Sequence, residues 1–246
     1  MNRISLYIIS IFCIAALGCT KSEDLKIITA EELYPLQVGK TFIYRLDSTV
    51  LANFNQQLQV KSYNAKDSVE SQFTDAQGRK SFRIFRYIRD TNNVKPWQYT
   101  ATYNAVFDAN RVEFVDNNLR FVTLVSPAKE GIVWKGTQNI NTISPSPYSY
   151  FSDWNFEYRN VGKPYTVKKG TIQNTYTVFQ QDETLPNVTF NANNYQEKSY
   201  SMEVYAKGVG LIYKDFIRWV YQPPSAVNKF YQEGSYGIRL SLIDNK

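Results

Sequence analysis

Alternating apolar and polar residues dominate the chain from about position 41 onward. In residues 41–50, "TFIYRLDSTV", the side chains of Phe42, Tyr44 and Leu46 share one face of an extended strand. The other face carries mainly polar groups. This period of two is typical of half-buried antiparallel strands, so the run predicts a strand with one face toward a core.

Two further runs show the same period. Residues 154–160, "WNFEYRN", and residues 199–208, "SYSMEVYAKG", are both rich in β-branched and aromatic residues, which favour strands. The predicted core-facing positions are Trp154, Phe156 and Tyr158 in the first run, and Tyr200, Met202 and Val204 in the second.

Clusters of Asp, Asn and Gly separate the alternating runs, as at 75–79 ("DAQGR"), 116–118 ("DNN") and 168–170 ("KKG"). These residues tolerate the backbone conformations of tight turns, so hairpins joined in a meander are predicted. No repeat and no linker divides the chain. Residues 34–246 are therefore predicted to form one all-β domain, a single curved antiparallel sheet or a barrel-like or half-barrel structure, with a β-sandwich as the alternative.

The first 18 residues follow a different pattern. Arg3 precedes an apolar run at 4–18, "ISLYIISIFCIAALG", that ends in small residues. The run is shorter than the roughly 20 residues that a membrane-spanning helix requires. A basic start, an apolar centre and small residues at the cut together predict a cleaved signal peptide at 1–18.

The residue after that cut is Cys19. "ALGC" at 16–19 resembles the bacterial lipobox, although its leucine stands second rather than first of the four. The resemblance implies that Cys19 is acylated and becomes the first residue of the mature protein, which anchors it in a membrane. Residues 19–33 are predicted to form the lipidated cysteine and a polar tether, with one capped helical turn at 29–33.

Two short stretches resemble segments of uncharacterised lipoproteins of Bacteroidota. They are "YPLQVGKTFIYRL" at 34–46 and "YAKGVGLIYKDF" at 205–216. The acidic pair Glu23 and Asp24 resembles the stretch after the lipidated cysteine in surface-displayed lipoproteins of the same phylum. The resemblance implies a curved antiparallel sheet and a lipid anchor in the outer membrane. It leaves open whether the domain faces the periplasm or the cell surface.

The formal net charge of +6 is spread along the chain. Its densest basic stretch is "FRIFRYIRD" at 82–90, where Arg83 and Arg89 share one strand face and Arg86 points to the other. No single basic stripe results, and the export signal also argues against a nucleic-acid partner. The expected partner is instead the membrane, through the lipid anchor.

The chain has no histidine, and its two cysteines are Cys13 in the signal peptide and the acylated Cys19. Catalysis by histidine or by a thiolate is thereby excluded. "SPAK" at 126–129 matches Ser-x-x-Lys but lacks the accompanying motifs of penicillin-binding proteins, so a turn is expected. No metal or other cofactor is predicted, because no loop has the spacing of a calcium site.

Carboxylates and aromatic residues are the remaining candidates for chemistry. Paired carboxylates would suit a glycosidase; the candidates are Glu130, Asp153, Glu157, Asp182 and Glu183. Exposed aromatic rings can stack on sugars; the candidates are Trp97, Trp134, Trp154 and Trp219. "DST" and "DSV" resemble the O-glycosylation sequon of Bacteroidota and would make Ser48 and Ser68 acceptors.

Three functions remain open from the sequence. The first is a non-catalytic binding or accessory module of the cell envelope, with an exposed apolar patch and a filled interior. The second is a carrier of a lipid or other apolar ligand in a β cavity. The third is a glycan-binding protein or a carboxylate glycosidase with aromatic residues along a groove.

Overall fold

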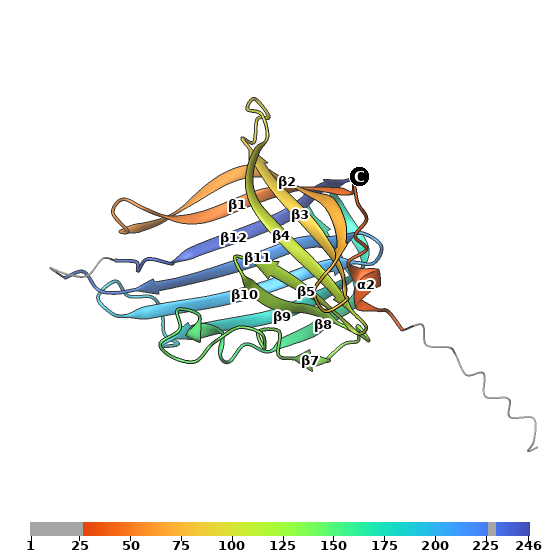
Figure 1. Cartoon of the computed structure of the whole chain (residues 1–246). Coiled ribbons are helices and arrows are strands. Elements are labelled where there is room, and N and C mark those ends of the chain that lie inside the picture. The colour runs from red at the N-terminus through yellow and green to blue at the C-terminus, as the bar shows by residue number, and fades with distance from the viewer. Residues whose placement is uncertain (1–26, 226–229) are drawn as a thin grey trace, which may run out of the picture.

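A computed structural model describes residues 27–225 and 230–246. Within these residues the chain forms one antiparallel sheet of 12 strands and almost no helix (Figure 1). The elements are α2 (Ala30–Leu33), β1 (Thr41–Ala52), β2 (Gln57–Thr74), β3 (Lys80–Arg89), β4 (Gln98–Asp108), β5 (Arg111–Asp116), β6 (Leu119–Val125), β7 (Val133–Trp134), η2 (Ser149–Phe151), β8 (Phe156–Val167), β9 (Gly170–Leu185), β10 (Gln196–Ala206), β11 (Gly210–Tyr221) and β12 (Tyr236–Asn245). The signal peptide and Cys19 lie outside the described residues, as do positions 20–26 of the tether.

The strand order follows the chain in two meanders. It is β6-β5-β4-β3-β2-β1-β12-β11-β10-β9-β8-β7, so the first and last strands pair in the middle of the sheet. Tyr44 of β1, for example, pairs with Leu242 of β12 and with Ala65 of β2. The two edges of the sheet are therefore β6 and β7, which lie close together in sequence.

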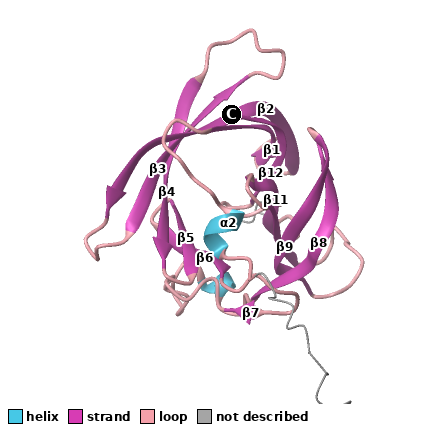
Figure 2. Ribbon diagram, turned by 90° about the vertical axis from the view of Figure 1, so that its right-hand side faces the viewer, coloured by secondary structure: helices cyan, strands magenta, loops and turns pink. Residues whose placement is uncertain are grey.

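The sheet curls until these edges meet (Figure 2). Trp134 in β7 donates its indole N–H to the carbonyl of Val122 in β6 at 2.7 Å. The Tyr158 hydroxyl in β8 donates to the Val125 carbonyl at 2.8 Å and accepts from the Val125 amide at 3.0 Å. These contacts define a seam between β6 and the β7–β8 edge. The prediction of one curved, barrel-like antiparallel sheet is confirmed, and the sandwich alternative is wrong.

The predicted core faces of two strands are confirmed. Phe42, Tyr44 and Leu46 are at most 8% exposed, as expected for alternate positions that face the inside of the barrel. Trp154, Phe156 and Tyr158 are at most 1% exposed, although Trp154 lies just before β8 begins.

The predicted face of β10 is wrong at two of its three positions, since Tyr200 and Met202 are only half buried, whereas Val204 is fully buried in the core. The register shifts beside this strand leave the extra residue on its neighbours, Gln180 in β9 and Ile212 in β11, so the alternation of β10 itself is unbroken. Ser201, Glu203 and Tyr205 occupy alternate positions that line the interior spaces, so the more polar face of β10 points inward.

Helix α2 lies across one end of the barrel (Figure 2). Thr29 and Glu32 form the predicted capping box, and Leu33 is fully buried. The carbonyl of Glu32 accepts a hydrogen bond from the Gly208 amide in the β10–β11 turn at 3.0 Å. The packed part of the chain therefore begins before Tyr34. No helix in the described part of the chain is long and apolar enough to cross a membrane.

Candidate functional site

The inside of the barrel contains a cavity of about 150 Å³, called here the inner cavity. Its wall consists largely of aromatic side chains, namely Phe114, Phe121, Phe151, Trp154, Phe216 and Tyr236. The rings contact one another at centroid distances of 4.7 Å for Phe151 and Trp154, and 4.9 Å for Phe216 and Tyr236. Polar side chains complete the lining; they are Asp116, Asn117, Thr123, Gln180, Ser201, Glu203 and Lys214. A predominantly apolar wall with a few fixed polar groups is typical of ligand sites.

The position of each site residue along β11 gives its depth in the barrel. Gly210 lies beside Tyr34, near the end that α2 covers. Lys214 and Phe216 line the inner cavity. Val220, further along the strand, lines a groove of about 490 Å³ at the other end, called here the outer groove. The interior therefore runs from a closed end at α2 to an open end.

Two buried ion pairs, called here the charged layer, lie at the closed side of the inner cavity. Arg86 in β3 binds both carboxylate oxygens of Asp67 in β2 at 2.6 Å. Lys214 in β11 pairs with Glu203 in β10 at 2.9 Å. Both pairs also border a smaller space of about 40 Å³ that shares part of the lining of the inner cavity.

Each cation of the charged layer keeps its proton because of its partner. Burial alone would lower the pKa of Arg86, but the adjacent Asp67 carboxylate outweighs it and raises that pKa. Burial would likewise lower the pKa of Lys214, and Glu203 raises it above the usual value. Both cations are therefore charged at physiological pH, each beside a carboxylate partner.

Buried tyrosines surround the charged layer. The Tyr205 hydroxyl donates to Glu203 at 2.7 Å, and the Tyr44 hydroxyl donates to the Leu211 carbonyl at 2.9 Å. Burial, followed by nearby carboxylates, raises the pKa of Tyr34, Tyr44 and Tyr205 well above the ordinary value of a phenol. These phenols stay neutral and act as hydrogen-bond donors.

One fully buried polar group of the inner cavity has no partner in the described part of the chain. Trp154 is only 1% exposed, and its indole Nε1 has no acceptor. Asp116 lines both interior spaces as a half-buried side chain, and neither a hydrogen bond nor an ion pair engages its carboxylate among the described residues. Buried polar groups in native proteins are nearly always hydrogen-bonded, so the indole marks where a bound molecule could supply the partner, and the nearby carboxylate is available to the same molecule.

The outer groove adjoins the inner cavity. Asn117, Leu119 and Tyr236 line both spaces, and the boundary that they form is called here the mouth. The guanidinium of Arg218 lies 5.0 Å from the ring centroid of Tyr150 and pairs with Glu197. Burial, with Asp116 as the next cause, raises the pKa of Tyr236 to about 12. The mouth is therefore polar and aromatic, with tyrosine hydroxyls that remain protonated.

The structure does not bring the four predicted tryptophans together. Only Trp154 lines the inner cavity. Trp134 belongs to the seam, and Trp97 lies 4.2 Å from the Arg89 guanidinium. Trp219 packs against Phe190 outside the inner cavity, at a centroid distance of 6.2 Å.

The other sequence candidates are dispersed. Ser48 and Ser68 are half-buried positions within β1 and β2, and Ser48 shares its strand face with Leu46. Both remain predicted glycan acceptors. The candidate carboxylates Glu130, Asp153, Glu157, Asp182 and Glu183 do not line the inner cavity. The cavity carboxylates are instead Asp116 and Glu203, which sequence reasoning did not select.

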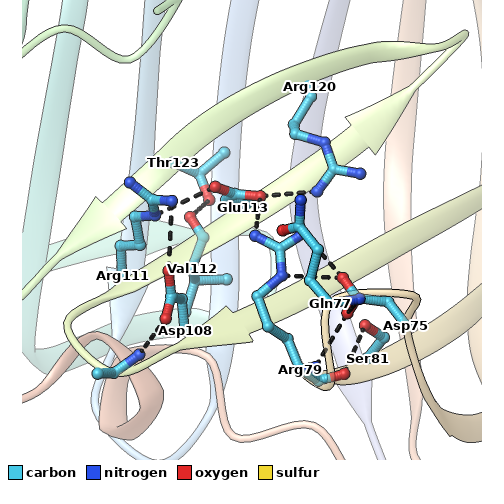
Figure 3. Close-up of polar contacts among 11 residues, drawn as sticks. Asp75, Gln77, Arg79, Ser81, Asp108, Arg111, Val112, Glu113, Arg120 and Thr123 are labelled. Carbon is cyan, nitrogen blue, oxygen red and sulfur yellow. Dashed lines mark hydrogen bonds and ion pairs between the residues drawn. The ribbon is translucent and has the colours of Figure 1, made fainter. Parts of the chain in front are cut away.

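A second charged cluster lies on the outer face of the sheet (Figure 3). Glu113, only 1% exposed, accepts from Arg120 at 2.7 Å and Arg79 at 3.2 Å, and pairs with Arg111 at 3.1 Å. It faces away from its neighbour Phe114, which lines the cavity. Asp75 and Asp108 balance two of these arginines, so the cluster is neutral and ties the β2–β3 turn to β5 and β6.

Solved structures that resemble this chain include two Bacteroidota proteins of similar extent. One is a Bacteroides fragilis protein thought to be exported, with a YmcC-like fold, 11% identical at a TM-score of 0.41. The other is a Parabacteroides distasonis protein thought to be a lipoprotein, 10% identical at a TM-score of 0.38. Each comparison covers 87% of this chain and 98% of the other chain. No family model matches the chain, and no curated protein is similar to it. At these scores neither likeness bears on the site.

Proposed function

We propose that the protein is a lipid-anchored, non-catalytic binding protein of the cell envelope that holds a small ligand inside its barrel. The observation that carries the proposal is an aromatic inner cavity of about 150 Å³ that adjoins the outer groove at the open end of the barrel. An engineered cavity of about that volume binds benzene, so the inner cavity accommodates the ring-sized part of a ligand. The predicted module with a filled interior is disfavoured by this cavity.

The position of the chain ends supports a particular orientation. Ile27, the first described residue, precedes α2 at the closed end, and the predicted anchor Cys19 lies eight residues before it. The outer groove opens at the other end of the barrel. An anchor attached near the closed end would point the mouth away from the membrane.

A non-catalytic role agrees with the interior chemistry. Glu203 is engaged by Lys214 and Tyr205, and Asp67 by Arg86. These two carboxylates are held by partners, so Asp116 has no second free carboxylate beside it in the inner cavity to form a paired acid and base. A glycan would have to lie in the outer groove, because an inner cavity of this volume does not admit an oligosaccharide.

Native mass spectrometry of a form that begins at Thr20 tests the proposal. This form contains every residue that the structure describes. We expect an added small-molecule mass that denaturation removes. Leu119→Trp should abolish it by narrowing the mouth, and Val94→Trp, on a side chain 82% exposed outside the site, should retain it. A bare mass for the unmodified form, or an added mass that survives Leu119→Trp, would reject the proposal.

A further inference from the structure

The charges that line the inner cavity do not cancel. Asp116 and Glu203 are acidic and Lys214 is basic, whereas the neighbouring Asp67–Arg86 pair is neutral. The Lys214 ammonium is bound to Glu203, and Asp116 lies within electrostatic range of the same ammonium. One negative charge therefore remains over these three groups, and the Asp116 carboxylate is the one without a hydrogen-bonding or ion-pairing partner in the described part of the chain.

The aromatic wall also favours a positively charged ligand. Phenylalanine, tyrosine and tryptophan rings attract cations to their faces through the negative potential of the π system. Rings of all three kinds line the inner cavity beside Asp116. An anion there would instead meet a lining of net negative charge, where like-charge repulsion is screened less than in bulk water.

The unpartnered indole adds one further requirement. The Nε1 of Trp154 is a donor only, and no described residue accepts from it. A ligand that places an oxygen acceptor against this nitrogen would satisfy a buried group that otherwise carries a desolvation cost. The aromatic wall, the free carboxylate and the indole N–H thus specify three parts of one molecule.

From these features we propose that the inner cavity binds a small protonated amine with an apolar, ring-sized body and a hydroxyl or carbonyl oxygen. Asp116 pairs with the ammonium group, the aromatic rings enclose the body, and Trp154 donates to the oxygen. This inference rests on the proposed function and adds the chemical class of the ligand to it.

Titration calorimetry on the form from Thr20 onward tests the ligand class. The probes are 4-hydroxybenzylamine, 4-hydroxybenzyl alcohol and 4-hydroxybenzoate, which share one ring and one hydroxyl but differ in charge. We expect the amine to bind at least tenfold more tightly than the benzoate. Asp116→Asn should weaken amine binding by roughly tenfold, as expected for a lost charged hydrogen bond. Asp182→Asn, outside the cavity lining in an exposed pair with Lys198, is the matched control and should change nothing.

The proposed hydrogen bond from the Trp154 indole to the ligand oxygen can be tested separately. Trp154→Phe should weaken binding of 4-hydroxybenzylamine more than binding of benzylamine, which lacks the hydroxyl. Equal losses for both amines would show that Trp154 acts only through packing and that a water molecule satisfies its N–H.

The outcomes separate the two proposals. The alcohol or the benzoate could bind with the same affinity as the amine, and Leu119→Trp could abolish that binding. In that case the interior binds ligands, but the inferred cationic class of ligand is wrong. The class is also wrong if Asp116→Asn leaves amine affinity unchanged. If none of the probes binds, the inferred ligand class is rejected, whatever native mass spectrometry shows about another ligand.

Discussion

At the scale of single residues, the interior of this protein differs from an ordinary β-sheet core. Tyr34, Tyr44 and Tyr205 are buried around the charged layer, and their pKa values are raised. Arg86, Asp67, Lys214 and Glu203 are mutually satisfied, whereas the Asp116 carboxylate and the Trp154 indole N–H have no partner among the described residues. We regard the satisfied groups as scaffold and the two unsatisfied groups as the part of the site that a ligand completes.

Asp67 should be among the most stability-sensitive residues. Asp67→Asn leaves the Arg86 guanidinium buried without its counter-charge, which typically costs about 3–5 kcal/mol of unfolding free energy. Asp47→Asn breaks the more exposed pair with Arg45 and should cost about 1 kcal/mol or less. Urea denaturation of both variants measures the difference, and equal losses would mean that the Asp67–Arg86 pair is not buried in solution.

The tyrosines predict a loss of stability at alkaline pH. A phenol with a raised pKa in the folded state stabilises the fold fully below its ordinary pKa of 10.0 and loses that contribution as pH rises above it. Urea denaturation should therefore show a steep decline in stability from about pH 10 upward. Tyr205→Phe should flatten that decline, and Tyr99→Phe, on a ring 58% exposed, should not. A pH-independent stability between 9 and 11 would be inconsistent with buried neutral phenols.

At the scale of elements, alternation located the strands well but did not always give the face that points inward. The runs at 41–50 and 154–160 gave the correct inward faces, because their apolar positions are the ones that line the core. In β10 the face with Ser201 and Glu203 points inward, which a rule that places the apolar face inside cannot predict. The site was missed for a further reason, since Asp116 and Glu203 come from strands far apart in sequence. Only Trp154 was anticipated.

The seam is the element that turns a curved sheet into a barrel. Tyr158→Phe removes the hydroxyl that bonds both the amide and the carbonyl of Val125. We expect a loss of about 1–3 kcal/mol in unfolding free energy. Hydrogen exchange should accelerate at Val125 in particular, while amides in the central pair β1 and β12 stay protected. Uniform acceleration across all strands would instead indicate global destabilisation without opening of the seam.

Helix α2 is the second closing element. Leu33→Ala empties a fully buried position where α2 covers the barrel end and should cost about 2–5 kcal/mol. The matched control is Val38→Ala, where the side chain is 57% exposed and little change is expected. Thermal unfolding of the two variants tests whether α2 is part of the packed domain. A Leu33→Ala protein as stable as the control would show that α2 does not hold this end closed.

At the scale of the whole molecule, the two ends of the barrel have different roles. The end at α2 is closed and leads toward the predicted anchor, and the opposite end carries the outer groove. Replacement of Cys19 by Ala should release the protein from membranes in cell fractionation, because acyl chains supply the proposed attachment. Persistence of the variant in the membrane fraction would contradict the lipid anchor and the orientation derived from it.

The central claim is that the barrel interior holds a small molecule. The most direct measurement is a crystal structure of the form from Thr20 onward, purified without denaturation and grown with 4-hydroxybenzylamine. The account predicts density for the amine in the inner cavity, with its nitrogen at Asp116 and its oxygen at Trp154 Nε1. A cavity filled by ordered water alone, or closed by the surrounding aromatic side chains, would contradict it.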